Sequence, residues 1–183
     1  MHYPPNEPIT FSRDCDAVII PSGDEVRLSE GVSGFLTQAL GGSFSVYIEG
    51  NLFRIAGVDA DAIGKEPIEP PNVPVNPTTK EIEKVVWEQL KTCYDPEIPI
   101  NVVDLGLIYS CEIQTVESNE YMAKVEMTLT APGCGMGDIL MQDVKEKIEI
   151  VPTIREANVE LVFDPPWNQS MMSETAQLEA GLL

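Results

Sequence analysis

Residues 121–151, YMAKVEMTLTAPGCGMGDILMQDVKEKIEIV, decide the fold of the larger part of this chain. Apolar and polar residues alternate over residues 121–129, which is the pattern of a half-buried strand. A glycine-rich loop follows. Apolar residues then recur at helical spacing from Ile139 to Ile148, before Pro152. The stretch therefore predicts a strand, a loop and an amphipathic helix.

The residues before this stretch predict a helix and another strand. Thr78 and Glu81 have the spacing of a capping box, and apolar residues follow at helical spacing, so we expect this helix to end near Asp95. Alternation over residues 107–113 predicts a strand, which the polar residues 117–120 join to the next one by a turn. The two strands should therefore run antiparallel.

A third strand is predicted from the alternation over residues 157–163. The order helix, strand, strand, helix, strand predicts an α+β domain with two helices on one face of a three-stranded sheet. If the third strand runs parallel to the second, three loops meet at one end of the sheet, and functional groups concentrate on such loops. These loops are residues 95–106, 130–137 and 164–168.

A proline-rich linker divides the chain. Its prolines cannot sustain a helix or a central strand, so residues 65–77 are predicted to connect a part spanning residues 1–64 to one spanning residues 78–183. In the first part, turn residues separate short apolar runs, and residues 43–48 and 52–55 form a predicted hairpin. We expect a small β domain with a scaffold or docking role.

Composition excludes several classes of function. Eleven basic and thirty acidic residues give a net charge of −19, which should repel nucleic acid and anionic membranes. No stretch is apolar enough to span a membrane, and the N-terminus lacks a basic cap with a hydrophobic run, so we expect a cytoplasmic protein. His2, the sole histidine, leaves no basis for a histidine-rich metal site.

Cys134 is the candidate functional residue. It lies just before the predicted second helix, where free N–H groups and the helix dipole favour a thiolate, the form that ligates iron or attacks an electrophile. Gly133 and Gly135 allow backbone conformations that are closed to other residues and a close approach by a ligand. A structural role for Cys134 is the alternative, and the residues alone leave both open.

The other cysteines have weaker claims. Cys93 and Cys111 fall on apolar faces of a predicted helix and strand, where cysteine packs as a small hydrophobe. Cys15 lies between Asp14 and Asp16, whose charges oppose thiolate formation. The four cysteines contain no C-x-x-C pair, so a closed metal site of adjacent ligands is not expected.

The loops near Cys134 contain further candidates. Asp95, Glu97 and Asp104 could position a metal ion or a partner, although turn formation explains Asp95 equally well. Thr130 is the first residue of the glycine-rich loop, and we expect it to support Cys134 together with these acidic residues. Trp167 follows two prolines and is either an anchor for a partner or a lid on the sheet.

Two long motifs carry a resemblance to a known family. Residues 95–109, followed by residues 130–136, resemble the small iron–sulfur targeting domain shared by SufT, PaaD and the eukaryotic cytosolic targeting factors. The N-terminal part looks like the extension that is characteristic of the SufT branch. This second resemblance rests on residues 13–15, 20–23, 37–44 and 49–54.

The resemblance implies a function. It implies an accessory factor that is not an enzyme and that assists delivery of iron–sulfur clusters to client proteins, with the SUF machinery and cluster carriers as partners. The family's reactive cysteine maps to Cys134, and its acidic motif maps to Asp95 and Glu97. One thiolate cannot complete an ordinary cluster site. We therefore expect iron or a cluster to be held transiently, shared between two chains of a homodimer or with a partner, and no tightly bound cofactor.

Two other readings stay open. The first is a protein-interaction module in which Cys134 is structural. The second is a thiol-dependent enzyme with Cys134 as nucleophile and Asp95 or Glu97 as base, although no histidine lies near these motifs.

Overall fold

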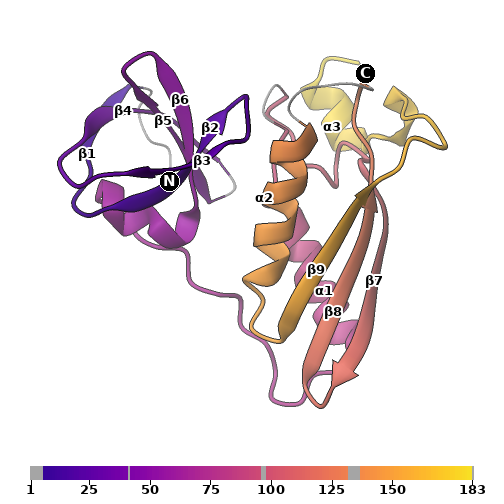
Figure 1. Cartoon of the computed structure of the whole chain (residues 1–183). Helices are drawn as coiled ribbons and strands as arrows, with labels where there is room; N and C mark the ends of the chain where they lie inside the picture. Colours follow the sequence, from indigo (N-terminus) through magenta and orange to yellow (C-terminus); the bar gives the residue numbers. More distant parts are fainter. Residues whose placement is uncertain (1–5, 41, 96–97, 132–136, 183) are drawn as a thin grey trace. The chain divides into compact units, whose positions relative to one another are not determined.

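The computed structural model (Figure 1) describes residues 6–40, 42–95, 98–131 and 137–182. The chain forms two compact units, Met1–Glu69 and Pro70–Leu183. The boundary lies inside the proline-rich segment. Within that segment, the backbone N–H groups of Lys65 and Ile68 donate hydrogen bonds to the carbonyl oxygens of Ala60 and Gly57, at 2.9 and 3.0 Å. The first unit therefore includes the start of this segment.

The first unit is a β domain, as predicted. Its antiparallel strands form one six-stranded sheet in the order β1-β4-β5-β6-β2-β3, followed by a short 3₁₀ helix, η1. The predicted hairpin is confirmed as β5 and β6, which are joined through Glu49 and Gly50 at φ values of 46° and 93°. The elements are β1 (Glu7–Thr10), β2 (Cys15–Ile20), β3 (Glu25–Leu28), β4 (Ser33–Leu40), β5 (Ser43–Ile48), β6 (Asn51–Ile55) and η1 (Gly57–Ile63).

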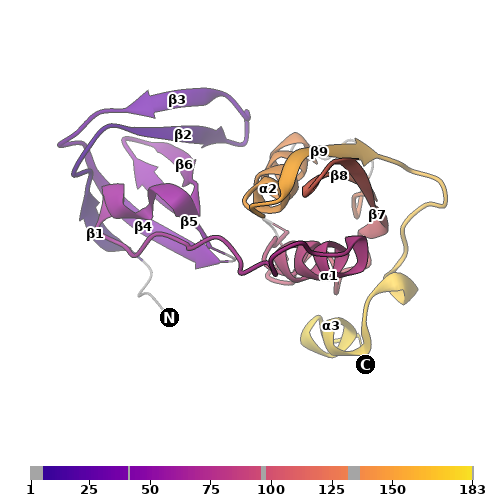
Figure 2. The ribbon, with the colours of Figure 1, turned by 90° about the horizontal axis from the view of Figure 1, so that it is seen from below.

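The second unit has the predicted order of elements. Strand β8 pairs antiparallel with β7 and parallel with β9, and α1 and α2 lie on one face of this sheet (Figure 2). Two short helices, η2 and α3, follow in a segment that the sequence did not predict to be helical. The elements are α1 (Thr79–Leu90), β7 (Ile108–Glu117), β8 (Glu120–Met127), α2 (Gly137–Glu149), β9 (Ile154–Leu161), η2 (Gln169–Met171) and α3 (Glu174–Glu179).

The capping box at the start of α1 is confirmed. The Thr78 hydroxyl accepts a hydrogen bond from the Glu81 backbone N–H at 3.3 Å, and the Glu81 carboxylate accepts from the Thr78 backbone N–H at 2.8 Å. The bond from the Thr78 N–H and a second one from the Thr78 hydroxyl, also at 2.8 Å, lower the pKa of the Glu81 carboxylate. The predicted end near Asp95 is wrong, because α1 ends at Leu90. The Cys93 carbonyl instead accepts a hydrogen bond from the Val102 N–H at 2.9 Å, and this pairing with a later loop replaces the last helical turn.

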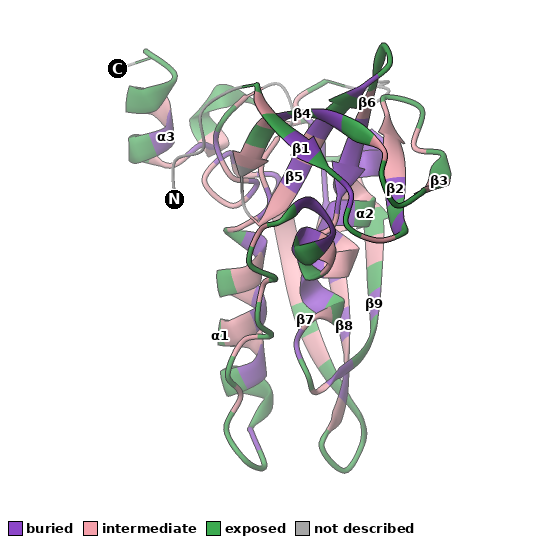
Figure 3. Ribbon diagram, turned by 90° about the vertical axis from the view of Figure 1, so that its left-hand side faces the viewer, coloured by how far each residue is buried: buried purple, intermediate pink, exposed green. Residues whose placement is uncertain are grey.

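Burial follows the predicted alternation in β8 and departs from it in β7. The odd-numbered residues of β8 are buried, and buried and exposed positions are also visible along α1 in Figure 3. In β7 a register shift between Ile108 and Ser110 breaks the alternation. Leu107 is buried, whereas Tyr109 is only half-buried. The odd-numbered residues of 107–113, which the alternation predicted to lie together on one face of the sheet, therefore do not all lie on that face. Strand β9 begins at Ile154 instead of Ala157, beside another register shift.

Candidate functional site

The strands of the second unit bring three loops to one end of the sheet. Ile108 at the start of β7 lies opposite Met127 at the end of β8, and Met127 lies opposite Leu161 at the end of β9. We call this end the rim. It comprises residues 95, 98–107, 128–131, 137 and 162–173 of the described chain, and it is the upper end of the sheet in Figure 1.

Backbone bonds join the strand ends at the rim. The Thr128 N–H donates to the Leu107 carbonyl and the Val162 N–H donates to the Met127 carbonyl, both at 2.8 Å. The loop before β7 and the segments after β8 and β9 are thereby anchored side by side. This arrangement agrees with the convergence that the sequence predicted for the described parts of the three loops.

Side-chain hydrogen bonds also join the segment after β9 to the loop before β7 and to the start of β7 itself. The indole N–H of Trp167 donates to the Leu105 carbonyl at 2.8 Å, and the Tyr109 hydroxyl donates to the Pro165 carbonyl at 2.7 Å. Trp167 is half-buried and packs against the hydrophobic core. These contacts support the lid reading, while a role for Trp167 in binding a partner stays a prediction.

Two glycines allow close packing at the rim. Gly106 has a φ of 70°, and a Cβ there would lie 2.2 Å from the backbone oxygen of Met171. A Cβ at Gly137 would lie 2.7 Å from Cδ1 of Leu129. Because Leu129 and Gly137 flank the glycine-rich loop, the two ends of this loop contact each other. The fold thus closes the loop tightly at its base.

The acidic candidates stabilise their own loop. Asp95 Oδ1 accepts a hydrogen bond from the Ile98 N–H at 2.9 Å, and Asp104 Oδ2 accepts one from the Asn101 side-chain amide at 2.5 Å. Asn101 Oδ1 accepts in turn from the backbone N–H groups of Val103 and Asp104, at 3.1 and 2.9 Å. The turn-forming role suggested for Asp95 thus holds, and Asp104 has a comparable one.

Thr128 is a rim residue that the sequence analysis missed. Its side chain is 1% exposed, and its hydroxyl has no hydrogen-bond partner among the described residues. Leaving such a group unpaired costs about 1–3 kcal/mol, so it needs an explanation. The alternation of β8 predicted an outward position for Thr128, but Met127, Thr128 and Leu129 are all buried. Thr153, at the opposite end of the sheet, also has a buried hydroxyl without a partner in the described chain.

The remaining candidates divide into described and undescribed residues. Thr130 is half-buried at the rim, near the end of β8. Cys134, Gly133, Gly135 and Glu97 lie outside the described residues. The structure therefore gathers Asp95, Asp104, Thr128, Thr130 and Trp167 at the rim.

The rim contains an open groove of about 690 Å³. Glu126 in its wall accepts a hydrogen bond from the Ser110 hydroxyl at 3.0 Å. No group of three or more histidine, cysteine or acidic residues in the described parts of the chain could hold a metal ion, and no described helix is long and apolar enough to cross a membrane. The groove is lined by Gly106, Ile108, Tyr109, Glu126, Val162, Asp164, Pro165 and Met171.

The three described cysteines belong to the two hydrophobic cores. Cys93 is fully buried, and burial, with a smaller effect of Glu83, raises the pKa of the half-buried Cys111 to about 12. Cys15 is 1% exposed, and its pKa is raised to about 11, mainly by burial and secondly by Asp59. The expected opposition to a Cys15 thiolate is present, but burial causes more of it than the neighbouring charges do.

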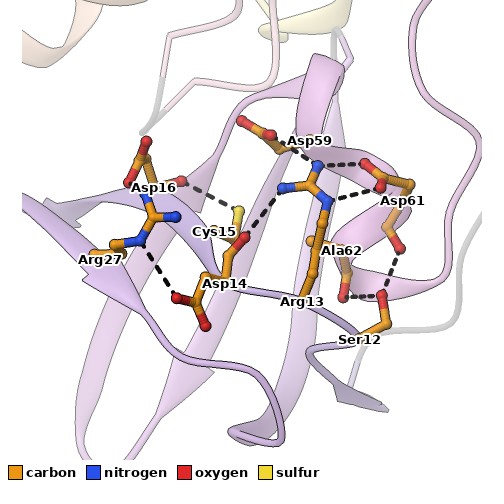
Figure 4. A network of polar contacts seen from close by, with 9 residues as sticks. All are labelled: Ser12, Arg13, Asp14, Cys15, Asp16, Arg27, Asp59, Asp61 and Ala62. Carbon is orange, nitrogen blue, oxygen red and sulfur yellow. Dashed lines mark hydrogen bonds and ion pairs between the residues drawn. The ribbon is translucent and has the colours of Figure 1, made fainter.

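The sequence motif around Cys15 forms a polar network within the first unit (Figure 4). The Arg13 guanidinium binds the Asp61 carboxylate through two hydrogen bonds, at 2.8 and 2.6 Å, and Asp59 Oδ1 at 2.9 Å. These contacts raise the pKa of Arg13 and lower that of Asp61. The Cys15 thiol donates to the Asp16 carbonyl at 3.3 Å. The network ties the start of β2 to η1.

Comparisons with known proteins match the second unit. Residues 83–161 match a family described as iron–sulfur cluster assembly protein. An Fe–S protein maturation auxiliary factor of Porphyromonas gingivalis is 45% identical over 101 residues, which are 55% of this chain and 92% of that protein. The factor SufT of Staphylococcus aureus is 38% identical over 88 residues, which are 48% of this chain and 96% of that protein.

A crystal structure of a domain of unknown function from Bacillus anthracis is also similar. It has a TM-score of 0.51 and 32% identity, and the match covers 57% of this chain and 96% of that one. The fold of the second unit is thus one already observed by crystallography. The chain belongs to the SufT-type family of iron–sulfur protein maturation auxiliary factors.

The matches leave about half of this chain without a counterpart. They cover more than nine tenths of each of these relatives but only 48–57% of the chain itself. These relatives are therefore too short to contain a second domain like the first unit. The similarity of the first unit to a SufT extension stays a prediction.

Proposed function

We propose that this protein assists the delivery of iron–sulfur clusters to client proteins and that Cys134 ligates iron or the cluster transiently. A role in iron–sulfur protein maturation follows from the family. The finer statement, delivery through one cysteine, rests on chemistry. A thiolate is the protein group that holds iron–sulfur clusters, and the three described cysteines are committed to packing.

The unpartnered hydroxyl of Thr128 carries this proposal. It is buried at the rim, and the glycine-rich loop that contains Cys134 starts and ends against the same point of the sheet, where Leu129 meets Gly137. A hydroxyl in a buried setting can donate a hydrogen bond to a thiolate or to a sulfide of the cargo. The cargo would then supply the hydrogen-bond partner that the buried Thr128 hydroxyl lacks.

The remaining candidates support the loop. Asp95 and Asp104 hold the neighbouring loop in shape through their hydrogen bonds, and Gly133 and Gly135 let a ligand approach the backbone. Glu97 completes the acidic motif, and Thr130 begins the loop. Because one chain offers one thiolate at this place, the cargo is shared with a second copy or with a carrier.

We further propose that the protein acts in the cytoplasm with the SUF machinery, cluster carriers and clients, and turns over no substrate of its own. A thiol-dependent enzyme is the competing idea. Multiple-turnover chemistry by purified, metal-free protein would favour that idea. An interaction module with a structural Cys134 is the other competitor, and it predicts a buried and unreactive thiol.

Complementation tests the proposal. A strain that lacks its factor of this family should regain the activity of cluster-dependent enzymes with the wild-type chain and fail to do so with Cys134→Ser. Cys111→Ala is the matched control, because it removes a described thiol that packs against the core, and it should complement. Immunoblots must show equal protein levels. Full complementation by Cys134→Ser would show that the proposed mechanism is wrong.

A further inference from the structure

Strand β9 has an open outer edge. It pairs only with β8 among the described strands. The backbone N–H of Val162, just after β9, points toward β8 and donates to the Met127 carbonyl, so the N–H groups of the preceding even-numbered residues point the same way. The Ala157 N–H points the other way and donates to Glu149 Oε1 at 3.2 Å. Successive N–H groups of a strand alternate in direction, so those of Val159 and Leu161 also point outward.

Among the described residues of this edge, a side chain caps the outward N–H of Ala157. Proteins blunt exposed strand edges with charged side chains, bulges or covering elements, since an open edge is a template for a further strand. The Glu149 side chain provides such a cap at Ala157. Within the described parts of the chain, no hydrogen bond engages the outward N–H of Val159. The half of the edge nearer to the rim is therefore available for pairing.

A groove lies beside residues 156–159 of β9, where the open half begins. It has a volume of about 370 Å³ and lies between α2 and β9. Met141 and Val159, both half-buried, provide its apolar surface, while the exposed carboxylates of Asp138 and Glu156 border it. Lys145 is the only cation among its lining residues, and its ammonium lies 3.9 Å from Glu149 Oε1. The groove thus combines a small apolar part at Met141, Ala157 and Val159 with a polar border on which carboxylates outnumber cations.

We propose that an extended segment of a partner protein, in which apolar side chains alternate with lysine or arginine, adds to β9 as a fourth strand. The main chain of the segment would pair with Val159 and Leu161. Its apolar side chains would enter the groove beside Met141, and its basic side chains would face Glu156 on the open face of the sheet. Charge complementarity favours a basic partner and disfavours a second copy of this chain, whose net charge is −19.

The location connects this surface to the rim. Leu161 ends β9 at the rim, and Asp138 lies in the first turn of α2, directly after the glycine-rich loop. A segment that pairs with β9 would therefore be led toward this loop. The inference goes beyond the proposed function and does not depend on it, because the pairing needs no ligation by Cys134.

Peptide titrations of the full-length chain test this inference. The probe is a capped pentapeptide, Lys-Val-Lys-Val-Lys, with Glu-Val-Glu-Val-Glu as the reversed-charge control. Amide NMR shifts and hydrogen exchange of the ¹⁵N-labelled chain report the site. We expect the lysine peptide to slow exchange of the Val159 and Leu161 amides and to shift the Met141 amide. The glutamate peptide should do neither.

Variants separate strand addition from general attraction. Glu156→Lys should weaken binding of the lysine peptide about fivefold, because an attractive charge becomes a repulsive one. Glu112→Lys is the matched control, since Glu112 is an exposed glutamate of the far strand β7, and its effect should be much smaller. Val159→Pro removes an outward N–H and should weaken binding about tenfold.

Three results would overturn the inference. They are equal effects of Glu156→Lys and Glu112→Lys, shifts centred away from β9, and unchanged exchange at Val159 with saturating peptide. A dimer mediated by β9, detected by sedimentation and abolished by Val159→Pro, would assign the edge to a second copy instead. Repeating the titration with Cys134→Ser keeps the test separate from the proposed function.

Discussion

One polar motif of the first unit and one polar residue of the second unit differ in how their hydrogen-bonding groups are used. In the first unit, the conspicuous Arg13-Asp14-Cys15 motif is taken up by internal contacts, since Arg13 binds two aspartates and Cys15 is buried. In the second unit, the inconspicuous Thr128 is buried at the rim without a partner. The comparison teaches that a motif prominent in the sequence can serve internal packing, whereas an inconspicuous residue can keep an unmet hydrogen-bonding need in the fold.

Thiol reactivity should give the largest contrast between the units. Near pH 8, a thiol with a pKa of about 11, such as Cys15, is a thiolate in about one molecule in a thousand, and Cys111 less often. We expect Cys134 to react with iodoacetamide at least about a hundred times faster than Cys15, because a sequence position shortly before a helix favours a thiolate. Mass spectrometry of timed samples measures the rates. Equal rates would remove the distinction between the units.

Glycine substitutions should give the next largest effect. Gly106→Ala places a Cβ against the Met171 backbone at a φ of 70°, so we expect a loss of about 3 kcal/mol or more in the free energy of unfolding. Gly50→Ala in the first unit has a φ of 93° but no atom within 4 Å of the added Cβ, and should cost only about 1 kcal/mol. Urea denaturation, monitored separately for each unit, measures both. Similar losses of unfolding free energy for the two variants would mean that the backbone around Gly106 and Met171 can shift to make room for the added Cβ.

Removal of the Thr128 hydroxyl should have a smaller effect on stability and a separate effect on function. Thr128→Val removes an unpaired buried hydroxyl with little change of shape, so we expect stability to rise by up to about 1 kcal/mol. Thr153→Val should behave similarly. Only Thr128→Val should reduce iron–sulfur loading during reconstitution, because Thr153 lies at the other end of the sheet. A decrease with both variants, or with neither, would contradict a special role for Thr128.

The Arg13 network should give the smallest effect, and that effect should depend on pH. Contact with Arg13 lowers the pKa of Asp61 in the folded state, so the contact stabilises the fold above the unfolded pKa, and this is lost as pH falls through the folded pKa. Arg13→Gln should therefore lower the urea midpoint near neutral pH and make less difference in acid. Arg27→Gln is the control. The Glu30 N–H is the main cause of the lowered pKa of Asp14, and Arg27 is a smaller one. Removing the Arg27 charge should therefore change the urea midpoint less than removing that of Arg13.

Local patterns predicted the order of elements in the second unit. The capping box at Thr78 and the alternation in β8 arise from contacts between residues close in the sequence, and both are confirmed. The end of α1 was predicted too late because the Cys93 carbonyl bonds to Val102 of a later loop. A sequence pattern contains no record of that pairing.

The site was predicted less completely than the fold. The convergence of the loops followed from strand directions alone, and the contact of Trp167 with Leu105 is consistent with a lid. The burial of Thr128 depends on segments that are distant in the sequence. The alternation over residues 121–129 predicted an outward side chain for Thr128, and only the folded rim shows it buried.

Anaerobic iron–sulfur reconstitution of the wild-type chain beside Cys134→Ser tests the central claim most directly. Visible absorbance reports the cluster, and native mass spectrometry reports the number of chains that hold it. We predict a cluster that dissociates readily, is shared between two chains, and is absent from Cys134→Ser. Equal loading of the two proteins would contradict the claim that Cys134 is the ligand.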